Sequence, residues 1–348
     1  MKILSIVGAR PQFIKASPVS HALRQRHQEV LVHTGQHYDR ALSAVFFEEM
    51  GIPEPDYNLG VGSGSHGQQT AQMLTELEQL MQQEEPDWVL VYGDTNSTLA
   101  GAIAAAKLHI PIAHVEAGLR SFNRAMPEEI NRILTDHAST LLLCPTQTAV
   151  SHLANEGITD SVHLVGDVMY DAMLSFLPKV DETAVLSQLD VTAREYVLAT
   201  VHRASNTDDA DSLTAVFDCL ALSPHPVLLP AHPRTVAAMK KWRVSLPNGV
   251  QLIEPVSYLS MLALEKNARF IMTDSGGVQK EAYLLGVPCI TLREETEWVE
   301  TAVDGWNTIA GVDLQKIHAA LSAPRPANAP PPVFGDGTAA VQITELIQ

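Results

Sequence analysis

The sequence has no long apolar segment. Across its 348 residues, no apolar run approaches the roughly 20 residues that a membrane-spanning helix needs. The stretch Ile3–Val7 is too short for the core of a signal peptide, and Gly8-Ala9-Arg10-Pro11 follows it where a small-residue cleavage site would be expected. We therefore expect a buried first strand and no insertion into a membrane.

Basic residues and cysteines are also scarce. Lys and Arg number 23 against 40 Asp and Glu, so the formal net charge is −17, which would repel nucleic acids and anionic membranes. Cys144, Cys219 and Cys289 form neither a CxxC motif nor a Cys/His ligand pattern. We expect core thiols in a cytoplasmic protein, without a metal or cofactor.

Apolar runs that alternate with amphipathic segments predict parallel sheets covered by helices on both faces. The length exceeds what one core usually supports, so we expect two Rossmann-like domains, residues 1–170 and 171–334. The expected strands are Lys2–Val7, Glu29–His33, Trp88–Tyr92, Ile112–Val115, Thr140–Cys144, Tyr196–Thr200, Pro226–Leu229, Val250–Ile253, Phe270–Thr273 and Cys289–Thr291.

Sequence signals predict the position of three helices. Ser17-Pro18 predicts the N-cap and first-turn proline of a helix that ends near Arg26, and another helix is expected over Ser97–Leu108. A short final helix is expected within residues 335–348, after an extended Pro- and Ala-rich segment.

Residues that follow the strands are the first candidates for function, because open parallel sheets bind ligands there. Gly8–Lys15 lacks the GxGxxG pattern of a dinucleotide site and the Gly-Lys-Ser/Thr ending of a P-loop, which disfavours NAD and ATP. Its Arg10 and Lys15 either bind an anion or are solvated surface charges.

Three carboxylates stand after strands or at helix starts of the first half. Asp94 either caps the next helix or has a chemical role. Glu116 ends a central strand, where an unpaired charge is costly, so it needs a partner or a function. Glu128 follows Pro127 at a helix start, which the helix dipole favours even without catalysis.

The second half has cations and glycines at its strand ends. His202-Arg203 and His232-Pro233-Arg234 each place a histidine near an arginine, which suggests a shared ligand. Ser275-Gly276-Gly277 leads from a strand into a helix, where exposed amides can hold a phosphate. A tight turn explains the glycines alone, but not the whole run to Glu281.

In this order, the segments resemble the non-hydrolysing UDP-N-acetylglucosamine 2-epimerases over nearly the whole chain. The resemblance implies an α/β, GT-B-like fold of two doubly wound domains facing a deep cleft, with helix 335–348 packing back on the first domain. It also implies a homodimer that acts on a UDP-sugar.

The resemblance also assigns site residues. The implied catalytic residues are Asp94, Glu116, Glu128 and His202. The implied binding residues are Ser275, Gly276 and Gly277 at the phosphates, Glu281 at the ribose, Arg10 near the diphosphate, and Lys15, His232 and Arg293. Gln36, His37 and Tyr38 lie where some bacterial relatives bind a regulatory nucleotide sugar, or they are ordinary loop residues.

The implied reaction explains why several carboxylates are present. The C2 hydrogen has no adjacent carbonyl, so UDP is eliminated to give a 2-acetamidoglucal and is added back with a proton on the opposite face of C2. Two faces require two proton-transfer groups, while cations and helix amides stabilise the departing diphosphate.

Two departures from the common family pattern bear on the sugar. Gln12 stands where a glutamate is usual, and Trp298 stands where the usual pattern has Arg-Pro after Thr296-Glu297. A neutral Gln12 would lower repulsion toward a uronic acid, and the variants resemble the enzymes of O-antigen assembly that act on UDP-2,3-diacetamido-2,3-dideoxy-glucuronate. UDP-N-acetylglucosamine stays the other candidate substrate. A retaining glycosyltransferase and a non-catalytic nucleotide-sugar-binding regulator are the alternative functions.

Overall fold

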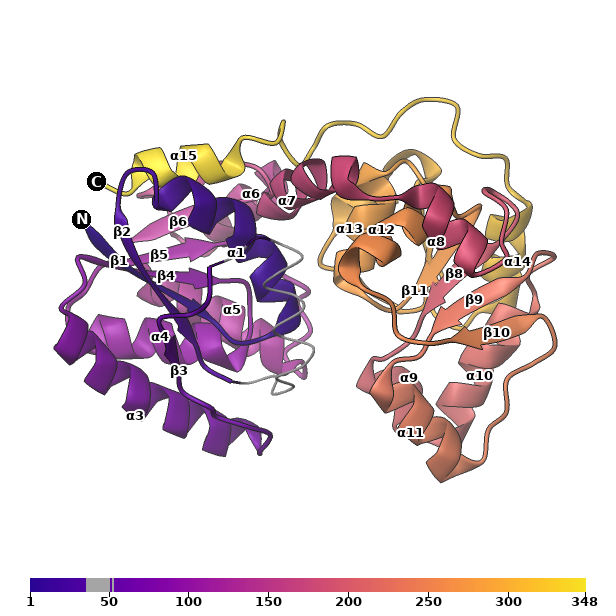
Figure 1. Ribbon diagram of the computed structural model, residues 1–348, viewed down its shortest axis with the longest axis horizontal. Coiled ribbons are helices and arrows are strands. Elements are labelled where there is room, and N and C mark those ends of the chain that lie inside the picture. Colours follow the sequence, from indigo (N-terminus) through magenta and orange to yellow (C-terminus); the bar gives the residue numbers. More distant parts are fainter. Residues whose placement is uncertain (36–50, 52) are drawn as a thin grey trace. The chain divides into compact units, whose positions relative to one another are not determined.

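The chain forms two compact units. The computed structural model describes residues 1–35, 51 and 53–348, with Arg10 and Asp304 described by their backbone alone. Unit 1 comprises Met1–Phe176 and Pro332–Gln348, and unit 2 comprises Leu177–Pro331 (Figure 1). Each unit has its own parallel sheet with helices around it, which confirms the predicted α/β class with two doubly wound sheets.

Unit 1 is built on a seven-stranded sheet in the order β3-β2-β1-β4-β5-β6-β7. The strands are β1 (Lys2–Val7), β2 (Gln28–His33), β3 (Tyr57–Asn58), β4 (Trp88–Tyr92), β5 (Ile112–Val115), β6 (Leu141–Cys144) and β7 (Val162–Leu164). The helices are α1 (Arg10–Leu23), α3 (His66–Glu84), α4 (Asn96–Lys107), α5 (Pro127–Ala138), α6 (Gln147–Asn155), α7 (Val168–Phe176) and α15 (Ala339–Leu346). Central strands β1, β4 and β5 are buried on both faces, which is why they are continuous apolar runs in the sequence.

Unit 2 has a six-stranded sheet in the order β10-β9-β8-β11-β12-β13. The strands are β8 (Val197–Thr200), β9 (Val227–Pro230), β10 (Val250–Ile253), β11 (Phe270–Thr273), β12 (Cys289–Thr291) and β13 (Asn307–Ile309). The helices are α8 (Glu182–Gln188), α9 (Ala204–Thr207), α10 (Ala210–Ala221), α11 (Pro233–Trp242), α12 (Tyr258–Asn267), α13 (Gly276–Leu284) and α14 (Leu314–Ser322), with short 3-10 turns at Leu177–Lys179 and Val299–Gly305.

Alternating residues of the unit 2 strands belong to two different hydrophobic cores. Met272 belongs to the same buried cluster as Phe217 of α10, while its neighbour Ile271 belongs to the cluster that contains Leu264 of α12. The two clusters lie on opposite faces of the sheet because successive strand side chains point in opposite directions. Because helices cover both faces of the sheet, the loops that follow the strands lie at the carboxyl edge of the sheet.

The first helix begins earlier than predicted. Helix α1 starts at Arg10, directly after β1, with Pro11 in its first turn and Pro18 inside the helix. The prediction that Ser17-Pro18 opens the helix is therefore wrong. Proline is favoured in a first turn, where its missing N–H costs nothing, and Pro11 occupies that place.

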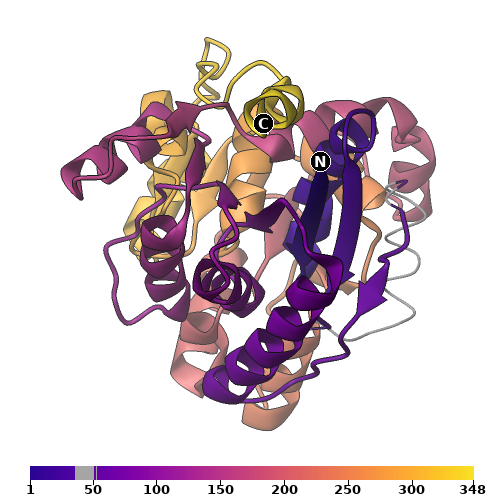
Figure 2. The ribbon, with the colours of Figure 1, turned by 90° about the vertical axis from the view of Figure 1, so that its left-hand side faces the viewer.

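The last helix packs within unit 1. Helix α15 contacts α1 and α7, and it lies beside α1 in both views (Figures 1 and 2). Ile343 and Ile347 are buried, and the Ala340 N–H donates to the Asp171 carboxylate at 2.8 Å. Within the ranges that the structure describes, no helix has the length and apolar character needed to cross a bilayer.

Candidate active site

A buried ion pair lies at the carboxyl ends of the central unit 1 strands. Lys15 of α1 pairs with Glu116, the residue directly after β5. The exposed fractions of these side chains are 12% and 3%. Shielding from water strengthens their attraction relative to a surface pair and holds the carboxylate in one position.

The backbone around this pair adopts conformations that most residues avoid. Glu116 has a φ of 69°, in the left-handed region, and its N–H donates to the Leu143 carbonyl at 3.1 Å. Gly93 has a φ of 61°, and a Cβ there would lie 3.2 Å from Lys15 Nζ and 3.3 Å from a Glu116 carboxylate oxygen. A non-glycine residue in this region is strained, so the surrounding structure holds Glu116 in an uncommon conformation directly after β5.

Asp94, the second predicted acid, is tied to helix α5. Its carboxylate accepts from Arg132 Nε at 3.0 Å, and its main-chain carbonyl accepts from the Asn131 side chain at 2.9 Å. Arg132 is 2% exposed, so it is itself fixed in place. Glu128 is four residues before Arg132 and therefore projects from the same face of α5.

The two acids at the start of α5 differ in their surroundings. Glu129 is 1% exposed and accepts hydrogen bonds from Ser121, Phe122 and Arg132, which gives it a structural role. Glu128 is partly exposed, and across the described ranges its carboxylate has no hydrogen bond or ion pair. Of the two, Glu128 is the one available to a substrate.

Gln12 does not have the position that the substrate argument assumed. Its side chain is buried; Oε1 accepts from the N–H groups of Gly8 at 2.8 Å and Ala9 at 3.0 Å. Its Nε2 donates to the Tyr92 carbonyl at 2.8 Å and to Thr98 Oγ1 at 3.0 Å. Gln12 therefore closes the start of α1 and offers no neutral contact to a ligand.

In unit 2, the loops after β8 and β9 bring two predicted histidines together. The ring centroids of His202 and His232 are 5.0 Å apart. Asp274, which follows β11 and is fully buried, accepts from the N–H groups of His202 and Arg203 at 2.9 Å. The Asn206 side chain donates to the same carboxylate at 3.0 Å, so Asp274 fixes the loop that carries His202.

Cations surround His202. Burial lowers the pKa of His202 below its ordinary value; Asp274 opposes the shift, and Arg203, Arg234 and Arg293 reinforce it. A neutral imidazole among guanidinium groups can donate a hydrogen bond to an anion without adding another positive charge. This environment fits a bound diphosphate.

The start of α13 has the features of a phosphate site. Ser275 is its N-cap, and Gly276 and Gly277 form its first turn. A Cβ on Gly276 would collide with the Glu297 carboxylate, so a larger residue there would have to displace Glu297. Arg293, which follows β12, donates to Glu297 at 2.9 Å, placing a guanidinium beside this turn. Helix amides and a cation together favour an anion.

Two further predicted residues lie on the helices of these clusters. Arg10 is the first residue of α1, and Glu281 is a buried residue of α13 whose carboxylate accepts from the Tyr258 hydroxyl at 2.9 Å. Gln36, His37 and Tyr38 lie outside the described residues. The described ranges hold no group of three or more His, Cys, Asp or Glu residues that could bind a metal ion.

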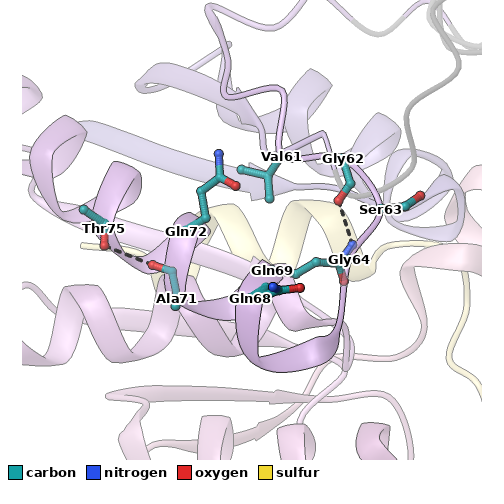
Figure 3. A pocket seen from close by; sticks show the side chains of 9 residues that line it. All are labelled: Val61, Gly62, Ser63, Gly64, Gln68, Gln69, Ala71, Gln72 and Thr75. Carbon is teal, nitrogen blue, oxygen red and sulfur yellow. Dashed lines mark hydrogen bonds between the residues drawn. The ribbon is translucent and has the colours of Figure 1, made fainter.

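Unit 1 also has a cavity of about 590 Å³ along α3 (Figure 3). Small and amide side chains line it, and Gln69 donates to the Gly62 carbonyl at 2.9 Å across one end. None of the predicted site residues lines this cavity. It is therefore not part of either strand-end cluster.

Comparison with known proteins identifies the family. The sequence profile described as UDP-N-acetylglucosamine 2-epimerase matches residues 21–348. A UDP-N-acetylglucosamine 2-epimerase homolog of Methanococcus maripaludis is 51% identical, covering 100% of this chain and 99% of that protein. The chain belongs to the UDP-N-acetylglucosamine 2-epimerase family.

Two further members of this epimerase family are informative. The UDP-2,3-diacetamido-2,3-dideoxy-D-glucuronate 2-epimerase of Pseudomonas aeruginosa is 49% identical, covering 100% of this chain and 99% of its own. The crystal structure of the Methanocaldococcus jannaschii UDP-GlcNAc 2-epimerase in complex with UDP-GlcNAc and UDP has a TM-score of 0.92 and 42% identity, covering 100% of this chain and 99% of that chain. The predicted GT-B-like fold class is thereby confirmed.

Sequence reasoning missed several residues of the candidate site. Arg132 fixes Asp94, and Asp274 fixes the His202 loop. Asp136 accepts from His114 at 2.7 Å and from Arg120 at 2.7 Å, and His114 also bonds the Gly93 carbonyl at 2.8 Å. Asp274 could have been found, because it directly follows a strand, whereas nothing in the spacing joins Asp136 to His114.

Proposed function

We propose that the protein is a non-hydrolysing 2-epimerase that inverts C2 of a UDP-2-acetamido sugar. The observation that carries this proposal is the buried Lys15–Glu116 pair, with Glu116 held at a left-handed φ of 69° at the end of a central strand. A fixed carboxylate beside an ammonium group can exchange a proton with a substrate carbon without moving itself. Membership of the epimerase family supports the same activity.

The unit 1 acids handle the C2 proton in this proposal. One carboxylate of Asp94, Glu116 and Glu128 removes the C2 proton as the C1–O bond to UDP breaks, which gives the 2-acetamidoglucal. UDP then adds back to C1 while a second acid delivers a proton to the opposite face of C2. The partial exposure of Glu128 and of Asp94, whose side chain is 32% exposed, supports access to a substrate.

Unit 2 holds the nucleotide in this proposal. Ser275, Gly276 and Gly277 bind the phosphates at the start of α13, and Glu281 binds the ribose. His202 and the neighbouring arginines stabilise the negative charge that grows on the departing diphosphate. The lowered pKa of His202 supports this role, because it keeps the ring neutral and able to donate an N–H hydrogen bond to the diphosphate.

Two substrates are candidates. UDP-N-acetylglucosamine and UDP-2,3-diacetamido-2,3-dideoxy-glucuronate are named for relatives at 44% and 49% identity, respectively. Both reactions invert the same carbon and need the same proton-transfer groups. The manno-configured product would supply surface polysaccharides such as O-antigen.

We also propose a cytoplasmic homodimer. Cys144, Cys219 and Cys289 are free and buried, which is typical of proteins in a reducing compartment. The family resemblance supports the dimer. Light scattering on a sizing column tests it directly, and a mass of 37.8 kDa, that of one chain, would contradict it.

The Glu116→Gln substitution tests the function. It keeps the shape of the side chain but removes the proton acceptor, so kcat should fall by roughly 10²–10⁴ while UDP still binds. Asp160→Asn, at an exposed turn before β7, removes a carboxylate elsewhere in unit 1 and should change neither quantity. Full turnover by Glu116→Gln would reject the catalytic assignment, and sugar transfer to an added acceptor would indicate a glycosyltransferase instead.

A further inference from the structure

Unit 2 contains a buried acid that the proposed chemistry does not use. Glu265 lies in the last turn of α12 and is 0% exposed. Neither of its carboxyl oxygens receives a hydrogen bond from an N–H or hydroxyl group within the described ranges. An ionised carboxylate without donors or water would be very costly at such a site, so this side chain keeps its proton.

A neutral carboxyl group has an O–H that needs an acceptor. Helix α12 packs against α13, and Glu281 of α13 is the carboxyl group that interacts with Glu265. Burial and the adjacent Glu281 raise the pKa of Glu265 well above its ordinary value. Of the other titratable groups facing Glu265, Tyr196 donates its own hydroxyl to the Leu264 carbonyl and Cys289 is a buried thiol, which leaves Glu281 as the titratable group suited to accept that proton.

Glu281 also receives a second donor from the same helix. The Tyr258 hydroxyl, at the opposite end of α12, donates to Glu281 Oε1 at 2.9 Å. Two donors on one rigid helix fix both the charge and the orientation of the Glu281 carboxylate. A carboxylate oriented in this way presents its remaining lone pairs in one direction.

We propose that Glu265 is a positioning residue that, as a neutral acid, donates its proton in a hydrogen bond to Glu281 and so orients Glu281 toward the ribose hydroxyls of UDP. The inference rests on the proposed function, which places the ribose at Glu281. Glu265 acts through Glu281 and does not touch the nucleotide. Its effect is therefore on nucleotide affinity rather than on the chemical step.

Two substitutions at Glu265 separate donation from packing. Glu265→Gln keeps the size of the side chain and an N–H that can donate to Glu281, whereas Glu265→Met keeps the size and removes the donor. UDP affinity of the full chain is measured by calorimetry, and KM and kcat by sugar turnover. We expect Glu265→Gln to stay within about threefold of the wild type, and Glu265→Met to weaken UDP binding about tenfold and raise KM with kcat unchanged.

Tyr258→Phe provides a second readout, because it removes the other donor to Glu281 and should also raise KM without lowering kcat. Thermal unfolding establishes that each variant is folded. The proposal is overturned if Glu265→Met binds UDP as tightly as the wild type, or if Glu265→Gln loses as much affinity as Glu265→Met. If Glu281→Ala leaves UDP affinity unchanged, the ribose placement in the proposed function has failed instead.

Discussion

At the scale of single residues, the geometry of the unit 1 site depends on a glycine, Gly93. Gly93 lies between β4 and Asp94, and its missing side chain leaves space for Lys15 and Glu116. His114 bonds its carbonyl and so fixes the loop from the other side. The position of the proposed catalytic acids therefore depends on main-chain geometry as well as on their own side chains.

Gly93→Ala should lower kcat by more than its loss of folding stability can explain. The new methyl group would press on Lys15 Nζ at 3.2 Å, and the φ of 61° would cost about 1 kcal/mol for any residue with a Cβ. Gly157→Ala is the matched control, because Gly157 has a φ of 81° and nothing within 4 Å of the added Cβ.

Thermal unfolding and steady-state kinetics on both variants measure the two effects. Both variants should lose a similar amount of stability, whereas only Gly93→Ala should lose kcat, by about tenfold or more. Equal kcat in the two variants would show that the Lys15–Glu116 geometry does not matter for turnover.

The lowered pKa of His202 predicts a pH effect on stability. Its ordinary value is 6.5, and the folded-state value lies below it, so the unfolded chain binds the proton more readily. His202 therefore costs no stability above pH 6.5, and the fold loses stability as the pH falls through 6.5 toward the folded value. His202→Asn should flatten this loss in a series of melting curves.

His318→Asn provides the control for that series. His318 is exposed on α14 of the same unit, so its removal should leave the acid dependence as in the wild type. Identical melting curves for His202→Asn and the wild type below pH 6.5 would contradict the assigned direction of the shift.

The sequence predicted which residues follow strands better than it predicted their contacts. Glu116 needed a partner, and the structure supplies Lys15. Gln12 was expected to lower repulsion toward a uronic acid because it is neutral, yet its amide hydrogen-bonds the backbone around it. A local motif cannot show this, because Tyr92 and Thr98 meet Gln12 only after β1 and β4 have paired.

At the scale of elements, the start of α13 is proposed to bind phosphate through its N-cap region. Ser275→Ala should lower stability by about 1 kcal/mol, because it removes the N-cap hydroxyl. It should also weaken UDP binding, since the helix amides are presented less well. Ser65→Ala, which removes the N-cap hydroxyl of α3 in unit 1, should lower stability similarly and leave UDP affinity unchanged.

Melting curves and UDP titrations on both serine variants separate these effects. A Ser275→Ala protein that binds UDP like the wild type would show that this cap has no part in the nucleotide site.

Strand prediction was accurate for β1, β4 and β5, which are continuous apolar runs buried on both faces. Strands β3, β7 and β13 were missed, because two or three partly exposed residues carry no readable periodicity. Helix α1 was placed too late because either of two prolines could have opened it, and only the contact of Gln12 with Gly8 and Ala9 decides between them.

At the scale of the whole molecule, the chain leaves unit 1 at Phe176 and returns to it at Pro332. The returning helix α15 is amphipathic, with Ile343 fully buried and Val341 50% exposed. Ile343→Ala should destabilise unit 1 by about 2–5 kcal/mol through the cavity that it leaves. Val341→Ala should change stability by no more than about 0.5 kcal/mol.

Denaturant unfolding monitored in both variants tests this asymmetry. Equal stabilities would contradict the packing of α15 against α1 and α7.

The central claim is that the protein exchanges the C2 hydrogen of a UDP-2-acetamido sugar with solvent. Proton NMR in deuterium oxide tests it most directly, with UDP-N-acetylglucosamine in one tube and its 2,3-diacetamido-glucuronate counterpart in another. An epimerase of this kind gives deuterium at C2 together with a manno-configured product, and the faster tube identifies the substrate. If both deuterium at C2 and a manno product are absent from both tubes, the protein is not a 2-epimerase of either sugar.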